Sequence, residues 1–200
     1  MKTLLRFLAV VVVCAMGSNA SAAGFRTVVI DPGHGGHDHG GQGAKVYEKH
    51  LALDTAMRLE ANLKRMGYQT VMTRRSDYFV SLPQRVAIGN RHKNAIFVSL
   101  HFNYTWKEHV CGLETFYHSA EGQKLAQCVQ HSLVRHTRTV DRNAKFARFY
   151  VIRNSTLPAI LVEGGFVTNE RERERMKSGD FREAIARGVA EGIQRYRRSN

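Results

Sequence analysis

The sequence of 200 residues is poor in the residue types that mark several classes of protein. It contains 3 prolines and no proline- and serine-rich stretch, which argues against a linker between domains. It contains 3 cysteines, too few for a four-cysteine zinc site, and only Cys111 and Cys128 lie outside the N-terminal segment. An oxidising export compartment would permit a disulfide between them, although we expect two buried thiols. The chain therefore has the size and composition of one globular domain.

Acidic residues are also scarce, because 17 Asp and Glu stand against 30 Lys and Arg and give a net charge of +13. This excess predicts an anionic neighbour, and an envelope polymer or a membrane surface suits an exported protein better than nucleic acid does. The sequence has no zinc finger or RNP-like aromatic motif, so we expect no nucleic-acid partner. An ordinary solvated basic surface is the alternative interpretation.

No apolar run reaches the ~20 residues that a membrane span needs. The run Phe7–Met16 follows Lys2 and Arg6 and precedes an A-x-A cleavage pattern that ends at Ala22. We therefore expect a signal peptide at 1–22, a single domain at 23–200, and no transmembrane segment after cleavage. Loss of the two basic residues leaves 28 basic against 17 acidic residues, a net charge of +11. The mature protein is expected to be periplasmic or secreted.

Hydrophobic periodicity predicts an alternation of strands and helices. Strands are expected at Thr27–Ile30, Tyr68–Thr73, Ala95–Leu100, Leu113–Tyr117 and 159–162. Helices are expected at Glu48–Met66, from Ser81 to about His92, at Glu121–His136 and at Phe181–Tyr196. This order predicts a single α/β domain with a twisted, mostly parallel sheet flanked by helices on both faces.

Polar residues follow three of the expected strands. His34 follows the first strand, and His101 and Glu163 close the strands AIFVSL and AILV. Ligands bind beyond the carboxyl ends of strands in such sheets, so these side chains can share one pocket with Glu48, which begins the first helix. Two histidines and one carboxylate make a catalytic zinc set, since three protein ligands leave the fourth position open.

Each of these residues also has a structural interpretation. A histidine at a strand end is commonly a hydrogen-bonded structural residue, and Glu48 on an exposed helix start is ordinarily a partner of the helix dipole. Glu163 is alternatively a buried carboxylate neutralised by Arg74 or Arg85. What favours the functional interpretation is that all four residues converge at strand or helix ends.

Other histidines, His37, His39 and His50, match a simple metal pattern equally well. A second hypothesis is therefore that the stretch HGGHDHGG binds a metal by itself. We consider this less consistent with the chain than a site in which only His34 of the loop takes part. Glycines at 33, 35 and 36 would then allow tight turns and leave room beside the metal.

The order of motifs along the chain resembles the zinc-dependent N-acetylmuramoyl-L-alanine amidases of bacterial cell-wall turnover. The resemblance extends from Thr27 to the C-terminus and rests on DPGHGG, Glu48-Lys49, TRRSD, L-x-x-R at Leu82–Arg85, SLHFN, GLETFY and LPAILVEGGFVTN. It implies zinc held by His34, Glu48 and His101, a catalytic glutamate at Glu163, and peptidoglycan as substrate. Asn103 matches a polar position of the family and would orient ligand or substrate, unless it makes a structural hydrogen bond.

Two other functions stay open on the sequence. One is a zinc peptidase that acts on stem peptides or other peptides, and the other is a wall-binding protein without catalysis. The chain shows no separate wall-binding module, so we expect its basic surface to attract it to the wall. It also lacks the long insertion that covers the metal in some relatives, because 118–158 is expected to hold one helix and a basic stretch at Thr137–Arg148. We therefore expect an open site that needs no obligatory activator protein.

Overall fold

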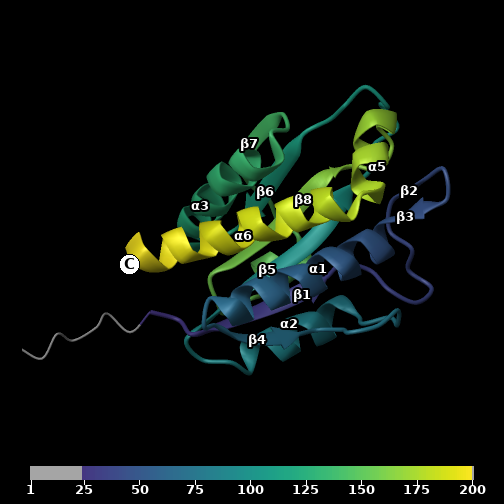
Figure 1. Ribbon diagram of the computed structural model, residues 1–200. Coiled ribbons are helices and arrows are strands. Elements are labelled where there is room, and N and C mark those ends of the chain that lie inside the picture. The colour runs from purple at the N-terminus through teal and green to yellow at the C-terminus, as the bar shows by residue number, and fades with distance from the viewer. Residues whose placement is uncertain (1–23, 200) are drawn as a thin grey trace, which may run out of the picture.

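A six-stranded sheet forms the centre of the protein, and the computed structural model describes residues 24–199 (Figure 1). Its strands are β1 (Thr27–Pro32), β4 (Gln69–Met72), β5 (Ala95–Asn103), β6 (Leu113–Tyr117), β7 (Asp141–Phe146) and β8 (Ala159–Phe166). They lie in the order β4-β1-β5-β8-β6-β7, and β4, β1, β5 and β8 are parallel to one another. A separate hairpin pairs β2 (Gln42–Gly43) with β3 (Val46–Tyr47). The predicted leader, 1–22, lies outside the described residues.

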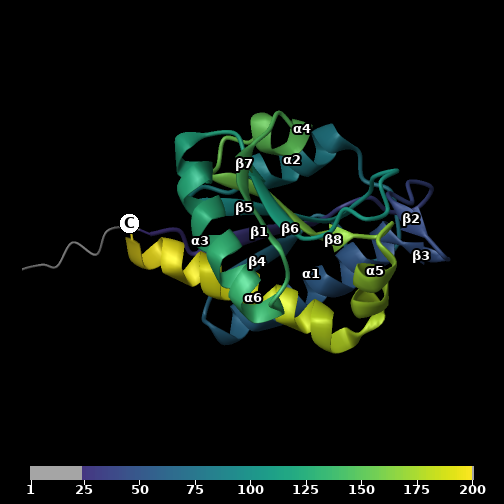
Figure 2. The same cartoon turned by 90° about the horizontal axis from the view of Figure 1, so that it is seen from above.

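Helices cover both faces of the sheet. They are α1 (Glu48–Arg65), α2 (Leu82–Asn90), α3 (Ala120–Thr137), α4 (Tyr150–Arg153), α5 (Glu170–Lys177) and α6 (Gly179–Ser199). Three of them, α1, α3 and α6, pack together on one face, whereas α2 and α4 lie on the other (Figure 2). The predicted single α/β domain with a mostly parallel sheet is therefore confirmed.

The long helices form where the sequence pattern predicts them. The stripe on α6, which includes Phe181, Ile185 and Val189, is buried against the rest of the core, as its helical spacing requires. In α2, the Ser81 side chain accepts a hydrogen bond from the Gln84 backbone N–H, and the Gln84 side chain accepts one from the Ser81 N–H. This capping box satisfies two backbone donors and begins the helix at the expected place.

Between Tyr117 and Ala159 the predicted helix is confirmed as α3, but the expectation that the interval holds little more than this helix is wrong. The structure adds β7, which pairs with β6 as the edge strand of the sheet, and the short helix α4. The sequence of β7, DRNAKF, is polar because an edge strand exposes much of its surface, so it lacks the apolar run that indicates a buried strand. A further helix, α5 (ERERERMK), was also not expected, because it buries only Glu172 and Met176.

Strand direction was only partly predicted. β6 is antiparallel to β8 and parallel to β7, so the last two strands of the sheet run opposite to the other four. As a result, β1, β5 and β8 end at one edge of the sheet, and β6 and β7 end at the other. The two ends of the described chain also lie at that second edge, where Phe25 packs against Tyr196 with ring centroids 5.8 Å apart (Figure 1).

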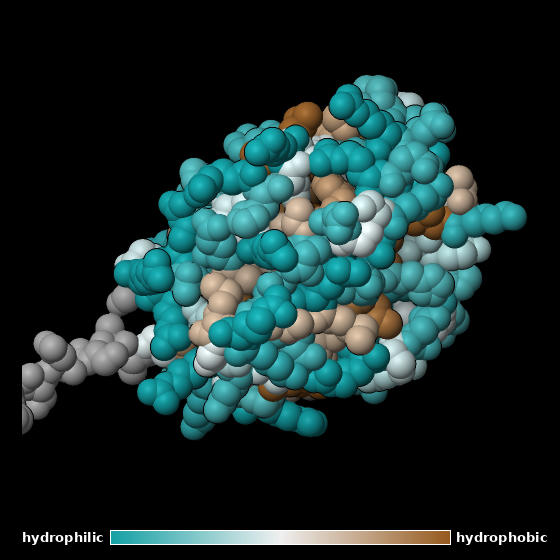
Figure 3. Space-filling model, viewed as in Figure 1, coloured by the Kyte–Doolittle hydropathy of each residue, from teal (hydrophilic) through white to brown (hydrophobic). Residues whose placement is uncertain are grey.

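Hydrophilic residues dominate the surface over α1, α3 and α6 (Figure 3). No helix within residues 24–199 is long and apolar enough to cross a membrane. Cys111 and Cys128 are free thiols, and each is half-buried.

Candidate metal centre and active site

Three potential metal ligands meet at the carboxyl edge of the sheet. His34 lies in the loop after β1, Glu48 is the first residue of α1, and His101 lies near the end of β5. One ligand atom from each residue lies within 4.8 Å of the other two. The structure therefore brings together the three residues that the sequence placed at strand and helix ends, and this group can hold a metal ion.

The carboxylate of Glu48 is the centre of this group. Its Oε1 lies 2.8 Å from His101 Nδ1 and 3.1 Å from His34 Nε2, and it accepts a hydrogen bond from the Phe102 backbone N–H. Its Oε2 accepts a hydrogen bond of 2.7 Å from the Gly41 N–H. Glu48 is only 5% exposed, so the alternative interpretation, an exposed helix start, is wrong. The loop before α1 folds back over the helix start and buries it.

Opposite shifts in pKa accompany this contact. Burial raises the pKa of Glu48, but the hydrogen bonds and positive charge of His101 and His34 outweigh it and hold that pKa well below its usual value. Burial lowers the pKa of His34, yet the interactions with Glu48 and Asp38 outweigh it and raise that pKa. These contacts favour the ionised form of the Glu48 carboxylate, which is the form that binds a metal ion.

A second carboxylate orients the first histidine. Asp38 Oδ2 lies 2.9 Å from His34 Nδ1, and Asp38 Oδ1 accepts a hydrogen bond from the Gly40 N–H. The contact fixes the imidazole so that Nε2 points to Glu48, as carboxylates do for metal-binding histidines. Asp38 was not singled out from the sequence, although a carboxylate four residues after His34 in a tight loop was a usable signal.

Glycines leave room for the histidine rings. A Cβ atom on Gly33 would lie 2.3 Å from Cε1 of His101, which confirms that this position needs the small residue. A Cβ on Gly40 would lie 2.5 Å from Cδ2 of His34, so Gly40 serves the same purpose and was not singled out from the sequence.

Two buried arginines hold the backbone of the His34 loop. His34 itself has a left-handed backbone with φ of 59°, and its carbonyl accepts a 2.6 Å hydrogen bond from Arg85 Nη2. Arg85 Nη1 donates to Pro32 O and to Asp31 Oδ1, and Arg74 Nη2 donates to Gly33 O. Three successive carbonyls are thus satisfied by guanidinium groups, which stabilises an otherwise unfavourable loop conformation. Burial and the charge of Arg85 lower the pKa of Arg74 to about 10.

Neither arginine neutralises Glu163, so that structural interpretation of Glu163 is wrong. Glu163 lies on β8 directly beside His101 on β5, and beside Glu114 on β6. It is 8% exposed, and its Oε2 has no hydrogen-bond partner among the described residues. Burial raises the pKa of Glu163 well above its usual value, and the nearby carboxylates of Glu48 and Glu114 raise it further. A buried carboxylate without a protein partner is costly, and such residues are concentrated at functional sites.

Both polar atoms of the Asn103 side chain form hydrogen bonds within the protein. Its Nδ2 donates to Glu114 Oε1 at 2.8 Å, and its Oδ1 accepts from the Tyr104 N–H at 2.8 Å. Glu114 also binds Arg142 and Lys145, which compensate its buried charge. Asn103 therefore links the end of β5 to the buried carboxylate of β6, next to Glu163.

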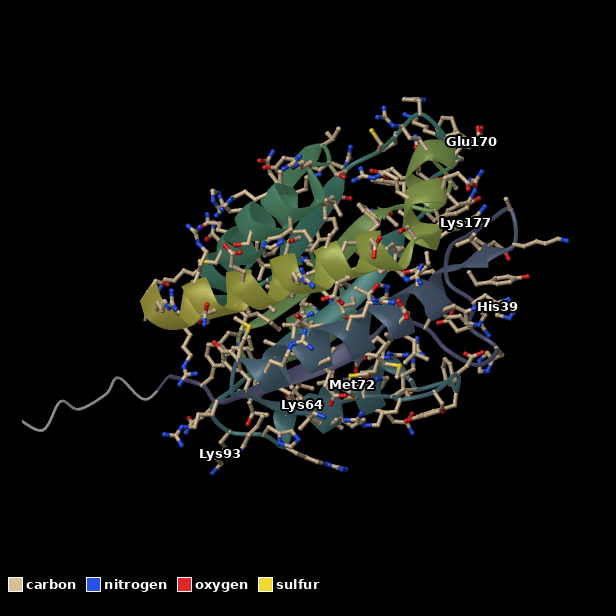
Figure 4. The ribbon with its side chains drawn as sticks, viewed as in Figure 1. His39, Lys64, Met72, Lys93, Glu170 and Lys177 are labelled. Atoms are coloured by element: carbon tan, nitrogen blue, oxygen red, sulfur yellow. The ribbon has the colours of Figure 1, made fainter. Side chains whose placement is uncertain are left out.

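The remaining histidines of the first loop stay outside the metal-binding group. His37 packs on Phe79 with ring centroids 4.3 Å apart, and His39 packs near Tyr47. In Figure 4 the labelled His39 lies toward the end of the molecule that carries the hairpin of β2 and β3. Within residues 24–199 the only group of three possible ligands is that of His34, Glu48 and His101. The structure thus gives no support to a self-contained site in the loop.

Comparisons with known proteins identify the family of the chain. Residues 28–195 match the family N-acetylmuramoyl-L-alanine amidase (Amidase_3). The chain belongs to this amidase family. It is 35% identical to the N-acetylmuramoyl-L-alanine amidase LytC of Bacillus subtilis (strain 168) over 86% of this chain, and it spans 36% of LytC.

Two solved amidase structures share the fold over nearly their whole length. The catalytic domain of CwlV from Bacillus (Paenibacillus) polymyxa var. colistinus has a TM-score of 0.83 and 35% identity, with 86% of this chain and 98% of that chain covered. The amidase from Clostridium difficile 630 has a TM-score of 0.85 and 34% identity, with coverages of 90% and 100%. The amidase fold of these proteins is therefore the fold of the whole described chain.

The residues present fit a bound metal ion. Among residues 24–199, two imidazoles and a carboxylate converge without a fourth ligand, and an unpartnered carboxylate oxygen of Glu163 is buried on the strand next to that of His101. This combination of three ligands and a free acid–base group is typical of catalytic rather than structural metal sites.

Proposed function

We propose that this amidase-family protein is a zinc-dependent hydrolase that cleaves peptidoglycan between the lactyl group of N-acetylmuramic acid and the L-alanine of the stem peptide. The observation that carries the proposal is the buried, unpartnered oxygen of Glu163 beside the group of His34, Glu48 and His101. A wall-binding protein without catalysis would have no need to keep this carboxylate uncompensated.

The three converging side chains of His34, Glu48 and His101 would hold the metal. Zinc accepts nitrogen and oxygen ligands in this number, and it supplies a Lewis acid that polarises the scissile carbonyl and lowers the pKa of water toward roughly 7. Asp38 would keep the His34 ring in place through Nδ1. The carboxylate of Glu48 is held by the Gly41 and Phe102 N–H groups, so its orientation does not depend on the metal.

Glu163 would act as the general base and then as the general acid. It would accept a proton from the attacking water and deliver that proton to the leaving amine of L-alanine. Its raised pKa favours the first step, because a carboxylate with a higher pKa is a stronger base toward the water proton. The nucleophile is water, so no covalent acyl-enzyme forms.

The experiment uses residues 23–200, stripped of metal with a chelator and reloaded with zinc, on purified peptidoglycan. Mass spectrometry should detect free stem peptides that begin with L-alanine, only in the zinc-loaded sample. His34→Ala should lose bound zinc and activity, whereas the matched control His37→Ala should keep both, because His37 only packs on Phe79. Fragments cut within the stem peptide would assign a peptidase instead, and equal activity of both variants would reject the metal site.

The cell wall is the proposed place of action, reached through export of the chain by the predicted signal peptide. We also propose that the site needs no activator protein, since the side chains of His34 and His101 are 22% and 19% exposed. Assay of the purified protein alone, followed by addition of envelope extract, tests this. Negligible activity alone with strong stimulation by a protein of the extract would contradict it.

A further inference from the structure

The edge of the sheet opposite the candidate site carries nearly all of the net charge of the described chain. We call this edge the basic end and define it by the segments that start or finish there: residues 24–26, 64–68, 91–94, 118–124, 147–158 and 194–199. These segments precede β1, β4, β5 and β8, follow β6 and β7, and include the last turn of α6. Figure 4 shows Lys93 at this side of the molecule and His39 at the opposite side.

The basic end holds eleven Lys and Arg side chains and a single carboxylate, that of Glu121. The eleven are Arg26, Lys64, Arg65, Arg91, Lys93, Lys124, Arg148, Arg153, Arg195, Arg197 and Arg198, and all are exposed. The rest of the described chain has 17 basic and 16 acidic residues, since Lys2 and Arg6 lie outside it. The molecule is therefore strongly polarised, with a net charge of +10 at one end and +1 elsewhere.

Intramolecular ion pairs do not explain this concentration of charge. Among the described residues, only two of the eleven cations pair with a carboxylate, Lys64 with Glu60 and Lys124 with Glu121. Like charges gathered on one surface repel each other and lower the stability of the fold. A surface of this kind is favourable when an anionic partner covers it.

Exposed aromatic rings lie at the basic end, and four others, Tyr78, Phe79, Tyr104 and Trp106, lie toward the site edge. Phe146 at the end of β7 is 56% exposed, and Phe149 and Tyr150 at the start of α4 are 43% and 38% exposed. Aromatic side chains between basic ones are typical of proteins that rest on the headgroup region of a bilayer, because the rings enter the interface while the cations bind lipid phosphates. A soluble anionic polymer would use the cations but would not require the rings.

We propose that the basic end docks on the surface of an anionic lipid bilayer, with the candidate active site facing away from it. The chain enters the described fold at this end, at Gly24, and α6 finishes there (Figure 1). The orientation exposes His34, Glu48 and His101 to material outside the membrane. This inference does not depend on the reaction that the site catalyses.

Vesicle binding of residues 23–200 tests the docking. Residues 1–22 are omitted because their apolar run would itself bind lipid, and all of the described residues lie within the remaining chain. We expect binding to vesicles of phosphatidylglycerol mixed with phosphatidylcholine, no binding to pure phosphatidylcholine, and release by salt.

Two triple variants with the same change in charge compare how much the cations at the basic end and those near the candidate site contribute to vesicle binding. The variant Arg195→Gln, Arg197→Gln, Arg198→Gln should lose on the order of 100-fold in vesicle binding, at about fivefold per cation. The control variant Lys45→Gln, Lys107→Gln, Arg171→Gln removes three exposed cations near the candidate site and should change binding by no more than about twofold, because these charges lie beyond the screening length. Both should keep the amidase activity of the parent. Equal losses in the two variants would reject a defined docking face.

Fluorescence gives the orientation directly. Trp106 is the only tryptophan, is 79% exposed, and lies in the loop after β5 on the site edge. Lipids with nitroxide headgroups should leave Trp106 unquenched and should quench the double variant Trp106→Phe, Phe149→Trp. Quenching of Trp106 to the same extent would overturn the orientation. A competition experiment separates lipid from soluble polymers. If a soluble phosphodiester wall polymer or DNA, added at a phosphate concentration equal to that of the anionic lipid, displaced the protein from vesicles, the basic end would recognise a polymer rather than lipid.

Discussion

Replacing Arg85 with methionine should lower the free energy of unfolding by about 3–5 kcal/mol, the usual cost of breaking a buried ion pair from one side. Arg85 is 2% exposed and Asp31 is fully buried, and the guanidinium lies 2.8 Å from the carboxylate. The variant leaves a buried negative charge without its cation. Hydroxyl groups of Thr73 and Ser99 still donate to Asp31, so we expect the lower part of this range.

The lost backbone contacts add to the effect. Arg85 also donates to the carbonyls of Pro32, His34 and Val80, and a buried carbonyl without a donor costs about 1–3 kcal/mol. These terms overlap with the ion pair and do not simply add. Lysine at this position restores the charge but not the fork of donors, so Arg85→Lys should fall between the parent and Arg85→Met, at about 2 kcal/mol.

Metal affinity should fall with stability, because Arg85 binds the carbonyl of the predicted ligand His34. Groups that orient a ligand without touching the metal typically contribute 10–100-fold in affinity. We therefore expect about a tenfold weaker affinity for zinc in Arg85→Lys, measured by competition with a chromophoric chelator at a temperature where the variant is folded.

Urea unfolding of the metal-free protein measures the stability change separately. Arg91→Met is the matched control, since Arg91 is an exposed arginine that follows α2 and should matter by less than about 0.5 kcal/mol. If Arg85→Met unfolded at the same urea concentration as Arg91→Met and bound zinc like the parent, the argument that guanidinium groups hold the His34 loop would be refuted.

Three further predictions follow from single side chains. Asp38→Asn should weaken zinc binding by about 10–100-fold, because the amide orients the His34 ring less firmly than the carboxylate does. Competition with a chelator measures the affinity, and circular dichroism should show little change in the fold. An unchanged affinity for zinc would show that Asp38 has no role in orienting His34. Glu163→Gln should keep zinc and lose about 10²–10⁴-fold in kcat, since an amide cannot take up a proton; near-parental turnover would make Glu163 structural. The hydrogen bonds from Arg75 lower the pKa of Glu60 to about 2, so this carboxylate stabilises the fold above pH 4.5 and that contribution disappears as the pH falls toward 2. Arg75→Gln should raise the pKa of Glu60 toward 4.5 in an NMR titration, and no change would show that Arg75 does not hold the carboxylate.

The sequence predicted the helices and strands in which buried apolar residues recur at a regular spacing. The buried strand of Ala95–Asn103 and the stripe of α6 are examples, because their side chains have only one favourable place, the core. The polar edge strand β7 and the charged helix α5 have no such pattern, since they are stabilised mainly by pairing and by a few contacts. The reversal of β6 had a usable signal: residues 104–112 connect β5 to β6 without a helix, and a parallel crossover normally needs one.

The sequence predicted the residues of the candidate site that lie at strand ends, but not the contacts that hold these residues in place. The ends of parallel strands meet at one edge, so His34, His101 and Glu163 could be grouped from their positions. The burial of Glu48 depends on how the loop at Gly40 and Gly41 folds back, and the left-handed conformation of His34 depends on Arg85, which is distant in sequence. Such long-range contacts leave no periodic trace in a single sequence.

The most direct test of the central claim is hydrolysis of peptidoglycan by the zinc-loaded protein in water labelled with ¹⁸O. If Glu163 activates water to cleave the bond between the lactyl group and L-alanine, one ¹⁸O will appear in the carboxylate of muramic acid, and the released peptide will begin with an unlabelled L-alanine. Label in a carboxylate of the stem peptide, with muramic acid still amidated, would contradict the account and assign the site to a peptidase.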